Sequence, residues 1–487
     1  ELGSGEKRPT RLGAHLYLTL LVLRPHRGSF PTRRVLVYDL TFHAPDGQLC
    51  DLDDAGFVDA QAVSYAAPGL PSVLLGATSE TVLRVLHASC RKLGGTGREA
   101  ADELDGHLRR TWNGAQRRSR ALLLTADQIY ADDVPEDMSS GIHLASELLL
   151  GFREWVPGST QHTDAVRQRA AFVRNHGLTV DAEAAHHHLI GFGEFAAMYL
   201  FAWSPALWDH ERLQPLLERA RRRNYEDAAR MRRALANVPT YMVMDDHEVT
   251  DDWPMDVIQH NRINQTTVGR WIIANGLAAC WCFQIEGNGR GRPPFLAQLT
   301  EYIERGLDLA GHYSADRRRS YDQVTDGYAR NTYGTRNLGS VTPTHPPIIL
   351  LDTRTQRRLS NSDAPGLLDA GGLSWLEAQL GRLPEDRNVP LVMVSPAPVL
   401  ADEIYDLAQS ADTVWDDRYV ADRESWSHNP TAFRDFLRTL AGARRKVVVM
   451  SGDVHFAYTA RGYFGDHDRL AIVQLRRRGI KNRPSGG

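Results

Sequence analysis

The chain has 487 residues, of which 42% are hydrophobic and 24% are charged, and its formal net charge at pH 7 is −3. This is the composition of a globular protein, and the length favours one large domain with an accessory domain. The small negative charge argues against a nucleic-acid-binding surface, and the four cysteines are too few for a disulfide framework. No apolar run approaches the roughly 18–20 residues that span a bilayer, so no transmembrane segment is predicted.

The chain begins at Glu1 rather than at a methionine, and no targeting signal is visible in it. We therefore expect a cytoplasmic protein, or an exported one if an N-terminal signal has been removed. Nothing in the sequence predicts the oligomeric state.

The N-terminal part contains strand-like runs separated by Gly, Pro and Asp, which read HLYLTLLVL, RRVLVYDLTFHA and PSVLLGAT. We predict a β-rich accessory domain over residues 1–80. It carries no cluster of catalytic residue types. The remaining residues, 81–487, are predicted to form the main domain.

In the main domain, short apolar runs alternate with helical patterns. Five runs rich in Val, Ile, Leu and Met read ALLL, TYMVM, PIILL, PLVMV and KVVVM, which is typical of strands buried on both faces. The polar stretch 311–345 is predicted to be a long loop over the site. Helices are predicted at 95–120, 140–152, 164–176, 182–203, 210–236, 261–278, 296–310, 371–382 and 430–442. The alternation indicates an α/β fold.

Polar and acidic side chains follow these predicted strands. In open α/β folds, the chemistry gathers beyond the carboxyl ends of the strands. Four carboxylates, a phenol and two imidazoles at such ends indicate a metal site rather than a core. These residues are Asp127, Tyr130, Asp245, Asp246, His247, Asp453 and His455.

The segment ADQIYADD offers Asp127, which can bridge two metals, and Tyr130 three residues later. Phenolate is a hard oxygen donor that suits Fe(III), and an adjacent cation can displace the phenol proton. The alternative is a polar strand end with a packing tyrosine. Cys90 ends another apolar stretch and is either a buried thiol, the favoured reading in isolation, or a thiolate ligand.

Two further motifs point to the same chemistry. Asp245 and Asp246 would repel each other without a cation or proton between them, although a solvated acidic loop remains possible. Asp453 and His455 lie on one face of an extended chain and form a good chelating pair, unless His455 is a structural histidine. Arg354 is predicted either to clamp a phosphate or to form a surface salt bridge.

Six segments occur in one order between residues 80 and 475: HASC, TADQIYADD, FGEFAAMYLFAWSP, DDHEVTDDW, LLDTRTQR and SGDVHFAY. As an ordered set they resemble the PhoD-like alkaline phosphatase/phosphodiesterase family of the metallophosphoesterase superfamily. The resemblance implies a four-layer α/β/β/α sandwich with a small N-terminal β-rich domain. It also implies a two-centre metal site between the sheets.

The resemblance assigns a set of ligands to each centre. It places Fe(III) on Cys90, Asp127, Tyr130 and His455. The second centre would hold Ca(II), or another divalent metal, with Asp127 as the bridge and Asp453 as a ligand.

The DDHE segment resembles the GNHE segment of related phosphatases, which makes Asp246 a ligand candidate and His247 the candidate acid near the leaving group. Members of the family often have an Asn shortly after DDHE, where this chain has Asp251 and Asp252, and Asp252 is the second choice for that ligand. The usual Gly before the motif Asp is Ala126 here. If that position needs a positive φ, Ala would strain the turn by about 1 kcal/mol.

The resemblance implies metal-dependent hydrolysis of phosphate esters, in which the metals activate water to the hydroxide that attacks phosphorus. Arg354 would help to neutralise the phosphoryl oxygens, and His247 would protonate the leaving group. Two alternatives stay open. One is phosphodiesterase or phospholipase D-like activity on lipid or polymer diesters. The other is a non-catalytic relative that only binds phosphorylated ligands, motivated by Ala126 and the unusual QLRRRGIKN segment.

Overall fold

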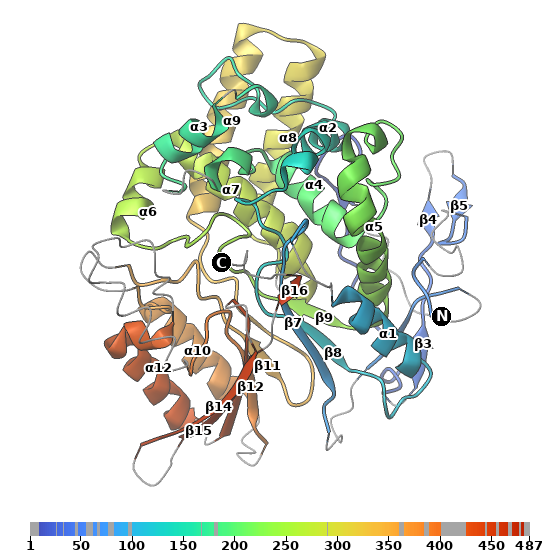
Figure 1. Ribbon diagram of the computed structural model, residues 1–487, viewed down its shortest axis with the longest axis vertical. Coiled ribbons are helices and arrows are strands. Elements are labelled where there is room, and N and C mark those ends of the chain that lie inside the picture. The colour runs from blue at the N-terminus through green and yellow to red at the C-terminus, as the bar shows by residue number, and fades with distance from the viewer. Residues whose placement is uncertain are drawn as a thin grey trace.

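The structure is a computed structural model of α/β class (Figure 1). It describes residues 9–25, 27–32, 34–43, 47–54, 62–65, 69–75, 82–95, 100–166, 168–179, 184–289, 291–359, 365–383, 389–400, 425–443, 446–453, 457–465, 470–476 and 479–481. In these ranges, no helix is long and apolar enough to cross a membrane.

Two sheets form the centre of the fold. The four-stranded sheet is entirely parallel, in the order β16 (Gly479–Lys481), β7 (Val85–Arg91), β8 (Ala121–Leu124) and β9 (Thr240–Met242). The six-stranded sheet has four parallel central strands and an antiparallel strand at each edge. Its order is β10 (Ser340–Val341), β11 (Ile348–Leu350), β12 (Leu391–Val394), β13 (Lys446–Ser451), β15 (Leu470–Arg476) and β14 (Tyr458–Phe464). Each of the five apolar runs contains one of these strands, as predicted.

The two faces of each sheet pack against different partners because successive side chains alternate along a strand. Leu123 of β8 packs in one cluster with Ile348, Leu350 and Val392 of the other sheet. Its neighbours on the opposite face join a cluster that includes Leu108 of α1 (Ala101–Thr111) and residues of α5 (Gln214–Asn237).

The outer face of the six-stranded sheet is covered in the same way. Ile349 and Met393 pack with Leu376 of α10 (Ala370–Arg382) and Phe436 of α12 (Pro430–Ala443). Figure 1 shows α10 and α12 on one side of the strands and α1 and α5 on the other. Both faces of the strands are therefore buried, which explains their uninterrupted apolar sequences.

A group of helices beside the sheets holds the largest hydrophobic cluster, which includes the fully buried Trp208 and Trp271. Figure 1 shows this group beyond one end of the strands. It comprises α2 (Glu136–Leu150), α3 (Arg169–Asn175), α4 (Phe192–Trp203), α6 (Val257–Asn264), α7 (Thr267–Cys280), α8 (Phe295–Gly311) and α9 (Ala315–Tyr333). The nine predicted helical regions each contain a helix, with ends that differ by several residues. The predicted helix 261–278 is divided at Thr266, whose side chain accepts from the Gly269 N–H at the start of α7.

The prediction of a long loop at 311–345 is wrong for most of its length, because α9 occupies residues 315–333. Ser314 begins the helix by accepting a hydrogen bond from the Arg317 N–H. The buried face includes Tyr321, Thr325 and Tyr328, spaced four and three residues apart. The helix packs on α7 and α8 through tyrosines and threonines, so a pattern of aliphatic residues could not reveal it.

The N-terminal strands are short and form three two-stranded sheets. They pair β1 (Thr10–Arg11) with β2 (Tyr17–Leu18), β3 (Val35–Val37) with β6 (Ser72–Leu74), and β4 (Phe42–His43) with β5 (Leu49–Cys50). The Ala14 N–H donates to the Leu150 carbonyl at 2.8 Å, and the Ser72 N–H donates to Asn237 Oδ1 at 2.9 Å. The turn between β1 and β2 therefore contacts α2, and β6 contacts α5, while a domain division at residue 80 stays a prediction.

Candidate metal centre

Several of the predicted site residues come together because β7, β8 and β9 are parallel neighbours whose carboxyl ends lie at one edge of their sheet. Cys90 lies at the end of β7, Asp127 follows β8, and Asp246 follows β9. The Arg91 N–H donates to the Asp127 carbonyl at 2.7 Å, which fixes the first two loops against each other.

Asp127 is the central carboxylate of this group. One ligand atom from each of Asp127, Asp246 and His247 lies within 4.8 Å of the others. Asp127 is 1% exposed, and its Oδ1 has no hydrogen-bond partner. Its Oδ2 lies 3.5 Å from the Tyr130 hydroxyl. A buried carboxylate oxygen without a donor is costly, and a cation would satisfy it.

The electrostatics of Asp127 support the same conclusion. Burial is the largest cause that raises its pKa well above the usual value, and the charges of Asp245, Asp246 and Glu248 add to it, while His247 opposes them. This clustering of negative charge disfavours the carboxylate unless a positive ion is present. The site therefore fits a metal ion.

Cys90 and Tyr130 lie beside Asp127 in a small buried cluster with Ala126. The Cys90 thiol donates to the Asp453 carbonyl at 3.6 Å. Burial, followed by the charges of Asp127 and Asp453, raises the pKa of this thiol. Thiolate ligation would consequently require a bound cation that displaces the proton.

The substitution of Ala for the family's usual Gly at position 126 does not strain the backbone by a positive φ. Ala126 is not among the residues with positive φ, whereas Cys90 (φ 32°), Asp252 (φ 60°) and Asp453 (φ 65°) are. A Cβ on Gly452 would lie 2.8 Å from the Ala126 Cβ. The absence of a side chain at Gly452 therefore leaves space for the Ala126 methyl group. Positive φ at three non-glycine residues is uncommon and is often found at functional sites.

Of the remaining predicted ligands, Asp252 lies beside Asp246, and Asp453 follows β13. The Asp252 N–H donates to Asp246 Oδ2 at 2.8 Å, and the carboxylates of both residues group with that of Asp251 within 4.8 Å. Asp453 is half-buried at the end of β13. His455 lies outside the described residues.

Arg354 is fully buried between two aspartates. Its Nε donates to Asp245 Oδ1 at 2.5 Å, and its Nη2 lies 3.0 Å from Asp246 Oδ1. Asp352 shapes the preceding turn by accepting the Arg354 N–H at 3.0 Å. In this position the guanidinium contacts the protein's own carboxylates, and its contact with a phosphate stays a prediction.

His247 pairs with Asp132, a residue that the sequence did not indicate as part of the site. Its Nδ1 lies 2.8 Å from Oδ1 of Asp132, and its Nε2 lies 3.6 Å from Asp251 Oδ1. Burial alone would lower the pKa of His247, but Asp132 and then Asp251 raise it well above the usual value. The protonated imidazole is therefore favoured. Asp132 belongs to ADQIYADD, but its position five residues after Asp127 gave no sign of its partner.

Glu248 is a second residue whose role the sequence did not reveal. It is fully buried and accepts from the Gln128 N–H at 2.5 Å, the Asp245 N–H at 2.7 Å and Gln284 Nε2 at 2.8 Å. Glu248 thus joins the loop of Asp127 to the loop of Asp246. Gln284 belongs to a π-helical turn, Trp281–Ile285, a distortion that occurs frequently at functional sites.

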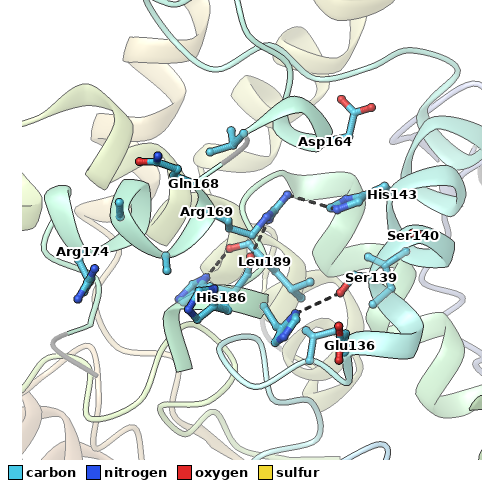
Figure 2. Close-up of a pocket in the computed structure, with 17 residues that line it drawn as sticks. Glu136, Ser139, Ser140, His143, Asp164, Gln168, Arg169, Arg174, His186 and Leu189 are labelled. Atoms are coloured by element: carbon cyan, nitrogen blue, oxygen red, sulfur yellow. Dashed lines mark hydrogen bonds between the residues drawn. The ribbon is translucent and has the colours of Figure 1, made fainter. Parts of the chain in front are cut away.

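A separate cavity of about 660 Å³ lies between α2, α3 and the turn His186–His188 (Figure 2). Arg169 at its wall pairs with the buried Glu194 and approaches His143, as Figure 2 shows for the last contact. The Leu189 N–H donates to the Ala131 carbonyl at 2.6 Å, so the cavity lies next to the segment that follows Tyr130. It is lined by none of the predicted metal ligands.

Comparisons with known proteins agree with the predicted resemblance. The family model for PhoD-like phosphatase matches residues 210–279, which include α5, β9 and the DDHE segment. A solved structure titled "Structure of PhoD" is similar with a TM-score of 0.43 and 12% sequence identity. That similarity covers 85% of this chain and 60% of the solved chain, so this chain spans less than two thirds of it. A search of curated proteins gave no match.

Proposed function

We propose that this chain, which is similar to PhoD-like phosphatases over residues 210–279, hydrolyses phosphate esters at the metal centre around Asp127. The observation that carries the proposal is the buried Oδ1 of Asp127, which has no donor and lies in a group with Asp246 and His247. Such a carboxylate is unfavourable in a purely structural role. It is favourable as a ligand.

The donor set supports two centres. Cys90, Asp127 and Tyr130, with His455, would hold Fe(III), because phenolate and carboxylate oxygens suit that ion. Asp127 would bridge to a second ion, Ca(II) by its preference for oxygen ligands, held also by Asp246, Asp252 or Asp453. When bound, the two ions would polarise the phosphoryl oxygens and lower the pKa of a water molecule. The paired sheets with helices outside them are, in this proposal, the four-layer sandwich of the family.

In this proposal, the proton for the leaving group comes from a side chain of the protein. His247 would donate its Nε2 proton to the leaving oxygen, while Asp132 holds Nδ1 at 2.8 Å and stabilises the protonated ring. Arg354 would keep Asp245 and Asp246 in place, since removing a buried guanidinium leaves two carboxylates facing each other.

The first test is activity on p-nitrophenyl phosphate and on bis(p-nitrophenyl) phosphate, before and after chelation. We expect activity to fall by at least about 10²-fold when the metals are removed and to return on reloading with iron and calcium. The metal content is measured by elemental analysis at each step. Full activity in protein verified to be metal-free would overturn the proposal.

A further inference from the structure

Lysine is rare in this chain, and one lysine lies beside the metal centre. The sequence has four lysines among 57 cationic side chains. One of them is Lys92, which directly follows Arg91, the residue whose N–H donates to the Asp127 carbonyl at 2.7 Å. The backbone at Lys92 is therefore fixed next to the central carboxylate of the site.

The side chain of Lys92 extends over Tyr130. Its Nζ lies 5.6 Å from the centre of the Tyr130 ring, and the hydroxyl of that ring lies 3.5 Å from Asp127 Oδ2. Lys92 forms an ion pair with Asp133, and the two side chains are 27% and 50% exposed. A pair that is open to water exchanges partners at little cost.

The guanidinium groups of Arg354 and Arg91 are not free to exchange partners in this way, because both are fully buried. Arg354 is fully buried between Asp245 and Asp246. Arg91 is also fully buried, and its Nη1 donates to the Ala202 carbonyl. Lys92 thus combines three properties that a substrate-binding cation needs: closeness to Tyr130, partial exposure and an exchangeable partner.

We propose that Lys92 binds the phosphoryl group of the substrate and makes the site selective for phosphomonoesters over phosphodiesters. This inference rests on the proposed function and names the substrate class of the same site. A monoester carries close to two negative charges at neutral pH, because its second pKa is about 6, whereas a diester carries one. The lysine ammonium is a compact charge with three donors, so it responds to the additional charge and to the additional unesterified oxygen.

Asp133 takes part as the competitor of the substrate. In the absence of substrate it holds the ammonium group over Tyr130. A monoester would displace this carboxylate, and the competition weakens binding. Removing the charge of Asp133 should accordingly strengthen the binding of the dianion.

The test compares Lys92→Met with Lys446→Met as the matched control in the full-length, metal-loaded protein. Lys446 is exposed at the amino end of β13, at the opposite end from the loop of Asp453. We expect Lys92→Met to lower kcat/KM for p-nitrophenyl phosphate about tenfold, mainly through KM, and to change the bis ester less than about threefold. Lys92→Arg should keep most of the selectivity, and Lys446→Met should resemble the wild type.

Two further measurements make the outcome independent of turnover. Binding of inorganic phosphate, measured by calorimetry, should weaken in Lys92→Met and strengthen in Asp133→Asn. Equal effects of Lys92→Met on both esters, or unchanged phosphate binding, would overturn the inference while leaving the hydrolase proposal intact. A metal-loaded wild type that hydrolyses neither ester would overturn the proposed function instead, and phosphate binding would then still report on Lys92.

Discussion

Buried carboxylates in this protein differ in what their oxygen atoms face. Glu194 is fully buried but pairs with Arg169 at 3.1 Å and with His143 at 2.8 Å. Asp245 pairs with Arg354. Asp127 Oδ1, by contrast, meets no donor. Because burying a carboxylate is costly, an oxygen that lacks a donor, as Asp127 Oδ1 does, would be stabilised by an external cation.

Asp132 positions His247, whose Nδ1 lies 2.8 Å from Asp132 Oδ1. Asp132→Asn keeps the shape of the side chain but removes the charge that stabilises the imidazolium. Loss of proton donation matters most for poor leaving groups, so we expect kcat to fall about 10²-fold on phenyl phosphate and less than about tenfold on p-nitrophenyl phosphate. His247→Asn should show the same pattern. Equal losses on the two substrates would argue that Asp132 has only a structural role.

Among the elements, the π-helical turn Trp281–Ile285 has the clearest link to the site, because it presents Gln284 to Glu248. Gln284→Leu removes one of the three donors of a buried carboxylate. We expect a loss of about 1–3 kcal/mol in the free energy of unfolding, together with reduced metal content per chain. Denaturant titration and elemental analysis measure the two effects. Gln323→Leu, on the exposed face of α9, is the control, and an equal loss in both variants would contradict this role.

The titratable side chain of Glu154 lies against the amino end of α4. Glu154 accepts from the Phe192 and Gly193 N–H groups, both at 2.9 Å, and from the Tyr302 hydroxyl at 2.7 Å. Burial raises the pKa of Glu154 to about 7, although the Tyr302 hydrogen bond opposes the shift. Gly193 is required here because a Cβ would lie 2.2 Å from Ser146 Oγ.

This pKa gives stability a definite dependence on pH. A carboxyl group whose pKa is higher in the folded than in the unfolded chain stabilises the fold below the unfolded value, and that stability is lost as pH rises through the folded value. We expect Glu154 to cost up to about 3 kcal/mol between about pH 4.5 and 7. Thermal unfolding of Glu154→Gln should depend less on pH over that range. Glu304→Gln, on the exposed face of α8, should behave as the wild type does.

For the molecule as a whole, the sequence predicted those features that depend on local pattern. Five apolar runs became five strands, and their carboxyl ends brought Asp127, Asp246 and His247 together. The helix α9 was missed because Tyr321 and Thr325 bury hydroxyl-bearing side chains that look polar in sequence. Asp132, Glu248 and Gln284 were missed for another reason. Their partners are fixed by how loops meet in space, which no spacing along the chain records.

The order of the strands has a consequence for how the protein is made. Cys90, Asp127 and Asp246 lie in the first half of the chain or close to it, whereas β13, which leads to Asp453, begins at Lys446 and pairs with β15. Because a nascent chain emerges from its amino end, Cys90, Asp127 and Asp246 are synthesised well before the strand that leads to Asp453. If the proposed metal centre includes Asp453, it can be completed only after that residue has been synthesised, and a chain that terminates earlier would lack one of its ligands.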